Sequence, residues 1–510
     1  MSQGSSATYD LYVVGGGING AGIAADAAGR GLAVGLCEMN DLASATSSAS
    51  SKLIHGGLRY LEQGEFRLVR EALGEREVLL RKAPHIIRPM RFRLPHNPKL
   101  RSAMVIQAGM LLYDRLARRT TLPASETLNS DSATPLRPEF NKLFEYSDAW
   151  VDDARLVVLN AMAARQAGAV ISTRTQCISA AREQGLWTIR LRNVAEGNER
   201  VVYSRALVNA VGPWVSRFYN HQLKETAPKQ VRLVQGSHIV VPRLYSGDEA
   251  YILQHSDRRI VFVLPYEGRF SLIGTTDLEH ETTPETISIT QDEVEYLLMV
   301  VNNHFLQQLN KDDVVHSFAG IRPLVCANTG PAQKASRDYE FSLDDDQGEA
   351  PLLSVFGGKI TTYRKLAEAA LNKLSPYFCD MRPAWTADTP LPGGDFSSPA
   401  ELLESFSQHY PWLPEELKQR YCRSYGTLSQ QILLYCQQLS DLGQHFGAGL
   451  YQREVEYLIE QEWALTAEDI LWRRSKLGLH MSSREIKALQ EYLQKRTQAC
   501  IRELIEAEQQ

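Results

Sequence analysis

A glycine-rich turn near the start of the chain constrains its fold more than any other feature. The turn fits the pattern G-x-G-x-x-G through Gly15, Gly17 and Gly20. It follows an apolar run at 10–14, which predicts a buried parallel strand, and it opens an alanine-rich segment at 18–30, which predicts a helix. A glycine turn between a strand and a helix is typical of a Rossmann-like unit that binds a dinucleotide.

Each glycine of this motif has a physical reason to be there. Gly15 allows the tight turn, Gly17 lets the backbone approach a pyrophosphate, and Gly20 lets helix and strand pack closely. The helix N-terminus offers unpaired N–H groups and the positive end of its dipole to phosphates. A second predicted strand at 32–38 ends in Glu38, 18 residues past the last glycine. A carboxylate at this spacing predicts an acceptor for ribose hydroxyls and argues against a 2′-phosphate.

A second glycine-rich turn favours a flavin over a nicotinamide cofactor. Gly357 and Gly358 follow an apolar run at 352–355, which predicts a strand, and precede a predicted helix at 362–374. The N-terminus of that helix would stabilise negative charge at the pyrimidine end of a flavin. The spacing alone leaves NAD as an alternative to FAD.

The chain has 510 residues, which is more than one hydrophobic core organises, so we expect two or three domains. Predicted strands at 237–241, 251–253, 260–264 and 270–273 indicate an antiparallel, substrate-binding sheet. Strand signals become rare after the Pro-Gly-Gly at 392–394, and helical ones dominate. We therefore predict a separate helical domain at the C-terminus.

Charge, cysteines and hydropathy narrow the cellular setting. The net charge of −5 does not favour nucleic acid as a partner. The seven cysteines are scattered without a C-x-x-C pair, which indicates reduced structural thiols and no cysteine-based metal site. No apolar run reaches the ~20 residues of a spanning helix, and residues 1–8 lack the features of a secretory signal. We expect an intracellular protein that would lie on one face of a membrane.

One stretch, at 88–120, suits such a membrane contact. It contains an apolar run at 103–113 and a single acidic residue, Asp114. Its basic residues are Arg88, Arg91, Arg93, Lys99, Arg101, Arg115, Arg118 and Arg119. The run is too short to cross a bilayer but suits the interface, with the basic residues on anionic headgroups. The alternative is a buried helix flanked by solvated or paired arginines. Sparse aromatic residues disfavour single-stranded nucleic acid.

Several longer strings carry a family resemblance that covers the chain from about residue 10 to the C-terminus. They lie at 15–31, 46–61, 152–156, 209–214, 236–242, 274–277, 320–324 and 356–364. Together they resemble FAD-dependent glycerol-3-phosphate dehydrogenases, and within that family the aerobic, membrane-bound bacterial members. The segment 326–331 and the N-terminal tail carry no recognisable motif.

The resemblance implies a fold, a reaction and partners. The fold is α/β (α+β): a Rossmann-like FAD-binding domain of the D-amino-acid-oxidase flavoprotein class, an antiparallel-sheet substrate domain and a helical C-terminal cap. The reaction is oxidation of sn-glycerol 3-phosphate to dihydroxyacetone phosphate, with electrons passing through FAD to ubiquinone. The implied setting is glycerol catabolism and respiration, in a homodimer on the cytoplasmic side of the inner membrane, against its phospholipid surface.

These expectations divide the chain into domains. The FAD-binding domain is discontinuous, at 9–80, 145–225 and 350–385. The substrate-binding and membrane-contact domain occupies 81–144 and 226–349, and the helical domain occupies 390–510.

The resemblance also assigns the cofactor contacts. They are Gly15, Gly17, Ile18, Asn19, Gly20 and Glu38 around the first turn; Thr46, Ser47, Ser51, Lys52, Leu53, His55 and Gly57 in the serine-rich segment; Cys177, Ala210, Gly212 and Trp214; and Gly358, Lys359, Thr361 and Thr362. For His55, a structural role in its turn is an alternative.

The substrate is a small dianion with a secondary alcohol, so its site needs cations and a base. Arginine suits phosphate because its planar fork can bond two oxygens, and Arg59 and Arg322 are the candidates. Tyr60 is a further hydroxyl donor. Lys359 follows two glycines, and its ammonium is expected at the substrate or the flavin, with a surface lysine as the alternative.

The catalytic base is less well defined by the sequence. His238 has a suitable ordinary pKa, although a core histidine bonded to backbone is the alternative. Arg322 stays protonated and is a poor base, but it can stabilise a developing alkoxide. The predicted catalytic residues are therefore His238, Arg322 and Lys359. Thr275, Thr276 and Thr362 are expected hydroxyl donors or structural turn residues.

Three other functions compete with the dehydrogenase. An oxidase would pass electrons from the same substrate to O2 and release hydrogen peroxide. A membrane-docked flavin-binding sensor would bind FAD without turnover. An amino-acid oxidase would share the fold but prefer a carboxylate and an amine to a phosphate.

Overall fold

The computed structural model describes residues 7–508 except 118–119, 130–133, 256, 258, 280–283, 285–286, 326–337 and 346–347, with no side chains at 59, 62, 63, 497 and 499–508. The side chain of Arg59, all of Arg118 and Arg119, and the segment 326–331 thus lie outside the described residues. Two compact units are present: residues 1–82 with 87–389, and residues 83–86 with 390–510. The finer division of the first unit into an FAD-binding and a substrate-binding domain stays a prediction.

The first unit contains an eight-stranded sheet with a parallel centre, in the order β17-β18-β10-β1-β2-β7, with β9 paired to β10 and β8 to β9. Its strands are β1 (Thr8–Val14), β2 (Val34–Cys37), β7 (Val170–Ser172), β10 (Glu199–Asn209), β18 (Leu352–Gly357) and the antiparallel β17 (Tyr339–Asp344). The predicted strands at 10–14, 32–38 and 352–355 are confirmed as β1, β2 and β18. The sequence pattern also predicts separate strands at 200–204 and 206–210, but these residues form one continuous strand, β10.

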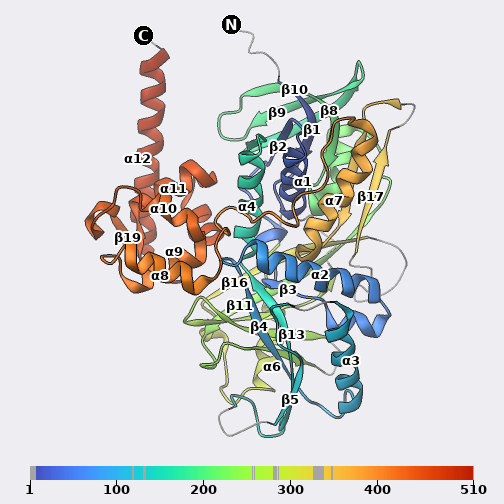
Figure 1. Ribbon diagram of the computed structural model, residues 1–510, viewed down its shortest axis with the longest axis vertical. Coiled ribbons are helices and arrows are strands. Elements are labelled where there is room, and N and C mark those ends of the chain that lie inside the picture. Colours follow the sequence, from blue (N-terminus) through green and yellow to red (C-terminus); the bar gives the residue numbers. More distant parts are fainter. Residues whose placement is uncertain are drawn as a thin grey trace. The chain divides into compact units, whose positions relative to one another are not determined.

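Helices α1 (Ile18–Gly29), α4 (Asp153–Gln166) and α7 (Tyr363–Leu374) form a layer in which α1 contacts both others (Figure 1). Parallel strands need crossover connections of this kind. The small residues of α1 allow the close approach. A Cβ on Gly22 would lie 2.8 Å from the ring of Tyr363. The predicted helices at 18–30 and 362–374 are confirmed.

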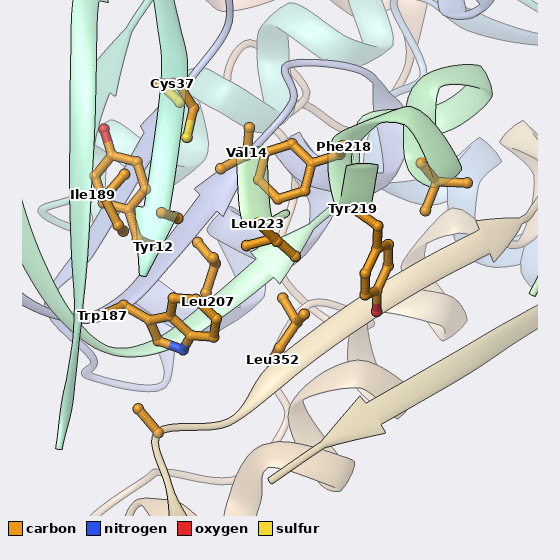
Figure 2. Close-up of a cluster of buried hydrophobic side chains, with 14 of the residues drawn as sticks. Tyr12, Val14, Cys37, Trp187, Ile189, Leu207, Phe218, Tyr219, Leu223 and Leu352 are labelled. Carbon is orange, nitrogen blue, oxygen red and sulfur yellow. The ribbon is translucent and has the colours of Figure 1, made fainter. Parts of the chain in front are cut away.

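A buried hydrophobic cluster joins the parallel sheet to the antiparallel pair β8 (Thr175–Glu183) and β9 (Leu186–Asn193). Figure 2 shows Tyr12 of β1, Leu207 of β10 and Leu352 of β18 among its members. Trp187, 1% exposed, donates its indole N–H to the carbonyl of Pro351. Burial of such a side chain contributes about 1.5–3 kcal/mol. The cluster therefore holds the sheet that carries the glycine turns.

The second sheet of the first unit has ten strands, in the order β15-β11-β14-β13-β12-β4-β6-β3, with β16 on β11 and β5 on β6. The strands are β3 (Leu53–Ile54), β4 (Ile87–Pro95), β5 (Glu126–Asn129), β6 (Lys142–Val151), β11 (Val231–Pro242), β12 (Ala250–Gln254), β13 (Ile260–Tyr266), β14 (Phe270–Gly274), β15 (Leu278–Glu279) and β16 (His316–Val325). The predicted sheet at 237–273 is confirmed by β11 to β14. Strands β4, β6 and β16 were not predicted.

Helix α6 (Gln291–Asn302) packs a row of buried apolar residues against this second sheet. A capping box starts the helix: Thr290 accepts from the amide of Glu293, and the carboxylate of Glu293 accepts from the amide of Thr290. The same carboxylate reaches into the sheet, as described below.

The second unit is helical, as predicted. Its helices include α8 (Pro399–His409), α9 (Glu415–Tyr425), α11 (Gln452–Glu462) and α12 (Ser483–Glu508), and its strands β19 (His445–Gly447) and β20 (Leu450–Tyr451) form one short pair. A buried ion pair between Arg420 and Glu454 joins α9 to α11, with Nη1 to Oε1 at 2.6 Å.

Candidate active site

The glycine turn lies where the carboxyl ends of four parallel strands, β1, β2, β10 and β18, meet at one edge of the sheet. Ligands of open α/β sheets bind at this edge. Gly15 has a φ of +114°, and a Cβ there would lie 2.6 Å from the carbonyl oxygen of Ala210. A Cβ on Gly20 would lie 1.9 Å from the carbonyl oxygen of Gly15. Both positions therefore need glycine.

The start of α1 is arranged to receive an anion. Gly17 is the N-cap and has no side chain to cap the helix, and the first turn has no acidic residue. The amide of Ile18 donates to Ser47 Oγ over 3.0 Å, which brings the serine-rich segment to the helix N-terminus. The exposed dipole end and the amides suit the pyrophosphate of a dinucleotide.

Glu38 ends β2 beside the same turn. Its Oε2 accepts from the amide of Gly16 at 2.7 Å, and its Oε1 accepts from the amide of Asn40 at 2.8 Å. Burial raises the pKa of the Glu38 carboxyl, while these two N–H donors oppose the rise. The carboxylate is thus held rigidly at the position where a ribose hydroxyl donor is expected.

Residues 338 positions apart in sequence meet at the first turn of α1. Asn19 Nδ2 donates to the carbonyl of Gly357 at 3.2 Å, and a Cβ on Gly358 would lie 2.9 Å from the same nitrogen. Asn19 Oδ1 is buried and has no hydrogen-bond partner among the described residues. The glycine cradle, the uncapped helix, Glu38 and this polar atom together fit a bound dinucleotide such as FAD.

Two hydrogen bonds and one backbone contact connect further segments that were predicted to bind the cofactor. Thr46 Oγ1 donates to the carbonyl of Ile321 in β16 at 2.6 Å. The amide of His55 donates to Thr361 Oγ1 at 3.3 Å. The 3-10 turn Gly212–Trp214 follows β10 and contacts β16.

Some predicted cofactor residues have side chains committed elsewhere. Lys52 forms a buried ion pair with Asp153, Nζ to Oδ1 at 2.8 Å, and also donates to the carbonyl of Ser48. Cys177 belongs to the hydrophobic cluster, and burial raises the pKa of its thiol. The side chains of Leu53 and Thr362 are also buried. Their predicted contacts with FAD would have to come from backbone atoms.

His238 is the buried member of the predicted catalytic set. Its ring is 1% exposed and stacks on Phe318 with ring centroids 4.9 Å apart. Nε2 lies 2.9 Å from Ser51 Oγ, and Nδ1 has no partner among the described residues. Burial, followed by the charges of Arg322 and Lys52, lowers the pKa of His238 well below its ordinary value. The imidazole is therefore neutral near pH 7, and the same environment makes it a weaker base than an exposed histidine.

Arg322 lies on β16 and is held by the segment that follows β14. Its Nη1 donates to Asp277 Oδ1 at 2.6 Å, and its Nη2 donates to Thr275 Oγ1 at 3.1 Å. A Cβ on Gly236 would lie 2.8 Å from Nη2, so the neighbouring strand needs a glycine there. The Arg322 side chain is 28% exposed, so part of it is accessible to a ligand.

Lys359 and Tyr60 come together, although their motifs are far apart in sequence. The Lys359 ammonium lies 4.1 Å from the centroid of the Tyr60 ring, and both side chains are half-buried. A Cβ on Gly357 would lie 3.7 Å from the carbonyl of Pro323, which follows Arg322. The turn that carries Lys359 therefore approaches the strand that carries Arg322.

Thr276 has the contacts expected of its structural alternative. Its side chain is 1% exposed, its hydroxyl donates to Glu293 Oε1 at 2.6 Å, and its hydroxyl oxygen accepts from the amide of Ser237. A hydroxyl can donate one hydrogen bond, and Thr276 donates its hydrogen bond to Glu293. Thr276 thus supports the loop that carries Thr275 and Asp277, and its predicted contact with substrate stays a prediction.

Sequence reasoning missed Asp277 and Glu293. Asp277 follows the predicted Thr275–Thr276 pair directly, so an acidic partner for Arg322 was visible within the motif. In the sequence, Glu293 indicates only the start of a helix, because a glutamate three residues after Thr290 is typical of a capping box. Its second role, accepting from Ser237, Gln235 and Thr276, depends on the tertiary structure.

Comparison with known proteins agrees with this geometry. Residues 10–364 match the family model described as FAD dependent oxidoreductase, and residues 384–499 match the C-terminal domain of alpha-glycerophosphate oxidase. The fold and the cofactor site define an FAD-dependent oxidoreductase of the D-amino-acid-oxidase class.

Individual relatives indicate which family within this class the chain resembles. The chain is 58% identical over 487 residues to a glycerol-3-phosphate dehydrogenase of Pseudomonas aeruginosa, with 95% of each chain covered. It is 50% identical over 492 residues to the aerobic glycerol-3-phosphate dehydrogenase of Escherichia coli, covering 96% of this chain and 98% of that one. A D-erythritol 1-phosphate dehydrogenase of Brucella abortus is 49% identical over 490 residues, covering 95% and 97%.

Among solved structures, a glycerol-3-phosphate dehydrogenase of Bacillus halodurans complexed with FAD superposes with a TM-score of 0.73 and 26% identity, covering 96% of this chain and 94% of that one. The chain belongs to the family of FAD-dependent glycerol-3-phosphate dehydrogenases. FAD is its cofactor.

Proposed function

We propose that this protein oxidises sn-glycerol 3-phosphate to dihydroxyacetone phosphate and that a membrane quinone, ubiquinone, is the final electron acceptor. The observation that supports this most is the approach of the glycine turn before Lys359 to the backbone of Pro323, the residue after Arg322. Two cations on adjoining segments suit a dianionic phosphate. The names of the relatives with 50–58% identity agree with this substrate.

FAD supplies the hydride acceptor when bound. Arg322, Lys359 and the hydroxyl of Tyr60 hold the phosphate, together with Arg59 of the same motif. Asp277 and Thr275 fix the guanidinium of Arg322, so that it does not have to reorganise when charge develops on the substrate oxygen.

His238 accepts the proton of the C2 hydroxyl in this proposal. Because its ring is 1% exposed, the contact with substrate runs through the half-buried hydroxyl of Ser51, 2.9 Å from Nε2. Ser51 takes the substrate proton while its own proton moves to His238 Nε2. This requires the tautomer in which Nε2 carries no hydrogen.

The relative that acts on D-erythritol 1-phosphate makes a longer polyol phosphate the main competing substrate. Initial rates with a soluble quinone, measured for glycerol 3-phosphate, D-erythritol 1-phosphate and glycerol, separate the possibilities. We expect the highest kcat/KM with glycerol 3-phosphate and the lowest with glycerol. A higher value with D-erythritol 1-phosphate would overturn the substrate assignment. Stoichiometric hydrogen peroxide would instead support the oxidase.

We also propose that helix α3 (Ala103–Leu116) lies on the lipid surface. It buries Ile106, Met110 and Tyr113 but leaves large apolar side chains in solvent. The exposed ones are Met104, Val105, Leu111 and Leu112, at 76, 60, 53 and 40% exposure. No helix in the described part of the chain is long and apolar enough to cross a bilayer. An exposed apolar face on a short helix suits the interface.

The basic residues of this stretch contribute less than the sequence predicted. Arg91 and Arg93 both pair with Glu145 at 2.7 Å, and they also reach Glu126 and Glu249. Arg88 stacks over the ring of Trp150. Arg91 and Arg93 are thus neutralised within the sheet, because acids distant in sequence lie across from them. Exposed Lys99 and Arg115 still flank the helix.

Flotation on phosphatidylcholine–phosphatidylglycerol vesicles tests the role of α3. We expect the double variant Met104→Glu, Leu111→Glu to lose most vesicle binding because two charges would enter the apolar boundary. The control is Met299→Glu, Leu306→Glu, which changes two exposed apolar residues elsewhere, at 41 and 58% exposure. Equal flotation of both variants and the parent protein would remove α3 from the membrane contact. The homodimer and the location on the inner membrane stay predictions.

A further inference from the structure

The buried side of α3 contacts the turn at Gly56–Gly57, which precedes Tyr60. Tyr113, 2% exposed, accepts a hydrogen bond from the amide of Gly56 at 2.9 Å. The hydroxyl donates to the carboxylate of Asp148 on β6, at 2.9 and 2.8 Å to its two oxygens. Asp148 Oδ1 also accepts from Arg76 Nη1 of α2 (Phe66–Lys82) at 2.6 Å. Helices α2 and α3 lie next to each other (Figure 1). The hydrogen bonds of Tyr113, Asp148 and Arg76 join them.

This network fixes the direction of the Tyr113 hydroxyl. Burial raises the pKa of Asp148, but the Arg76 guanidinium is the largest influence that opposes it. An ionised carboxylate only accepts hydrogen bonds, so the Tyr113 proton points to Asp148 and an oxygen lone pair is left for Gly56. A hydrogen bond between buried groups of this kind has a well-defined geometry.

The backbone at Gly56 sits directly against that hydroxyl. A Cβ on Gly56 would lie 2.6 Å from Tyr113 Oη and 2.5 Å from Leu73 Cδ2. Gly57 then has a φ of +76° and begins the 3-10 helix Leu58–Gln63, and a Cβ there would meet the Tyr60 ring at 2.2 Å. The position of Gly56 therefore decides where Tyr60 lies, and Tyr60 is the ring that the Lys359 ammonium contacts.

We propose that Tyr113 is a positioning residue for the phosphate end of the substrate site: it holds Gly56 so that Tyr60 and Lys359 stay together. Tyr113 itself touches no substrate atom in this account. The inference rests on the proposed function, because it assumes that Tyr60 and Lys359 receive the phosphate.

Tyr113→Phe tests the proposal, since it removes the hydroxyl and keeps the ring. The variant should fold, because the amide of Gly56 already lies 3.4 Å from Asp148 Oδ1 and retains an acceptor. We expect the KM for glycerol 3-phosphate and the inhibition constant of inorganic phosphate each to rise about tenfold, as for one buried hydrogen bond. We expect kcat to change less than about twofold and flavin content to stay equal.

A matched control is Tyr146→Phe, which removes a buried hydroxyl from the ring that packs edge-on against Tyr113, with centroids 5.6 Å apart. It should leave both constants unchanged. Stabilisation of the holoenzyme against heat by inorganic phosphate gives a second reading without turnover. It should be weaker in Tyr113→Phe than in the parent protein and in the control.

The outcomes separate the two claims. If the parent protein does not oxidise glycerol 3-phosphate, the proposed function is refuted. If the parent turns over but Tyr113→Phe keeps its phosphate constants, the positioning role is refuted. Equal losses in both tyrosine variants would also refute it, because the effect would then be one of general packing.

Discussion

At the scale of single residues, the account depends most on Arg322. Replacing it with alanine removes a guanidinium that Asp277 and Thr275 hold in place. We expect kcat/KM for glycerol 3-phosphate to fall at least about a hundredfold. The flavin should stay bound, because the glycine turn and Glu38 are untouched. Arg243→Ala is the control, since that arginine directly follows β11 and bonds loop carbonyls and Asp248. Near-normal kinetics of Arg322→Ala would contradict the assignment.

The buried His238 predicts a dependence of stability on pH. Its pKa is lowered well below the ordinary 6.5 by burial and by Arg322 and Lys52, so the folded protein keeps it neutral. Below about pH 6.5 the unfolded chain binds a proton at this site that the folded chain does not, and stability falls as pH falls. The loss for one site approaches about 1.4 kcal/mol per pH unit.

His238→Gln should therefore flatten the decline of the unfolding free energy between about pH 6.5 and 5. Thermal unfolding over that range measures it. The exposed His409 of α8, changed to Gln, is the control and should leave the decline as it is. A decline in His238→Gln as steep as in the parent protein would show that this ring does not cause it.

Sequence patterns found the residues of the site better than their partners. The pairing of Glu38 with the glycine turn follows from motif spacing, and the structure has it. The commitment of Lys52 to Asp153, and of Thr276 to Glu293, could not be read from spacing. Each depends on a buried carboxylate that is distant in sequence, and burial decides whether a polar side chain is free for a ligand.

At the scale of elements, the close packing of α1 on β1 is the feature most sensitive to substitution. A Cβ on Gly20 would lie 1.9 Å from the carbonyl oxygen of Gly15, so Gly20→Ala must push the helix away from the turn. We expect loss of flavin and a lower melting temperature. Gly74→Ala in α2 is the matched control, because no atom lies within 4 Å of its added Cβ and alanine favours a helix by about 1 kcal/mol.

The measurement is the flavin-to-protein absorbance ratio of both purified variants. A Gly20→Ala protein with full flavin content and unchanged melting would contradict the role given to this contact.

The elements that the sequence predicted are those with clear periodicity. The apolar spacing at 66–82 predicts a helix, which is found as α2 with the same bounds, and the strands β11 to β14 lie where alternation placed them. Strand β4 was missed because its arginines suggested a basic surface. They alternate with buried residues and pair with Glu145 of the neighbouring strand β6. Strand β16 was missed because Gly320 and Pro323 lower its strand signal.

At the scale of the whole molecule, the site exists because a parallel sheet brings distant segments to one edge. The turn at 15–20, the segment at 210–214 and the turn at 357–358 follow three neighbouring strands, β1, β10 and β18. Strand–helix alternation in the sequence predicts this class of parallel, crossover topology. The contact of the second sheet with this edge, through Thr46 and Ile321, could not be predicted, because it depends on packing between the two sheets.

The most direct test of the central claim is the visible spectrum of the purified protein, recorded without oxygen before and after addition of glycerol 3-phosphate. The account predicts that the flavin band bleaches and that a soluble quinone restores it. A bound flavin that stays oxidised with this substrate would contradict the proposed function.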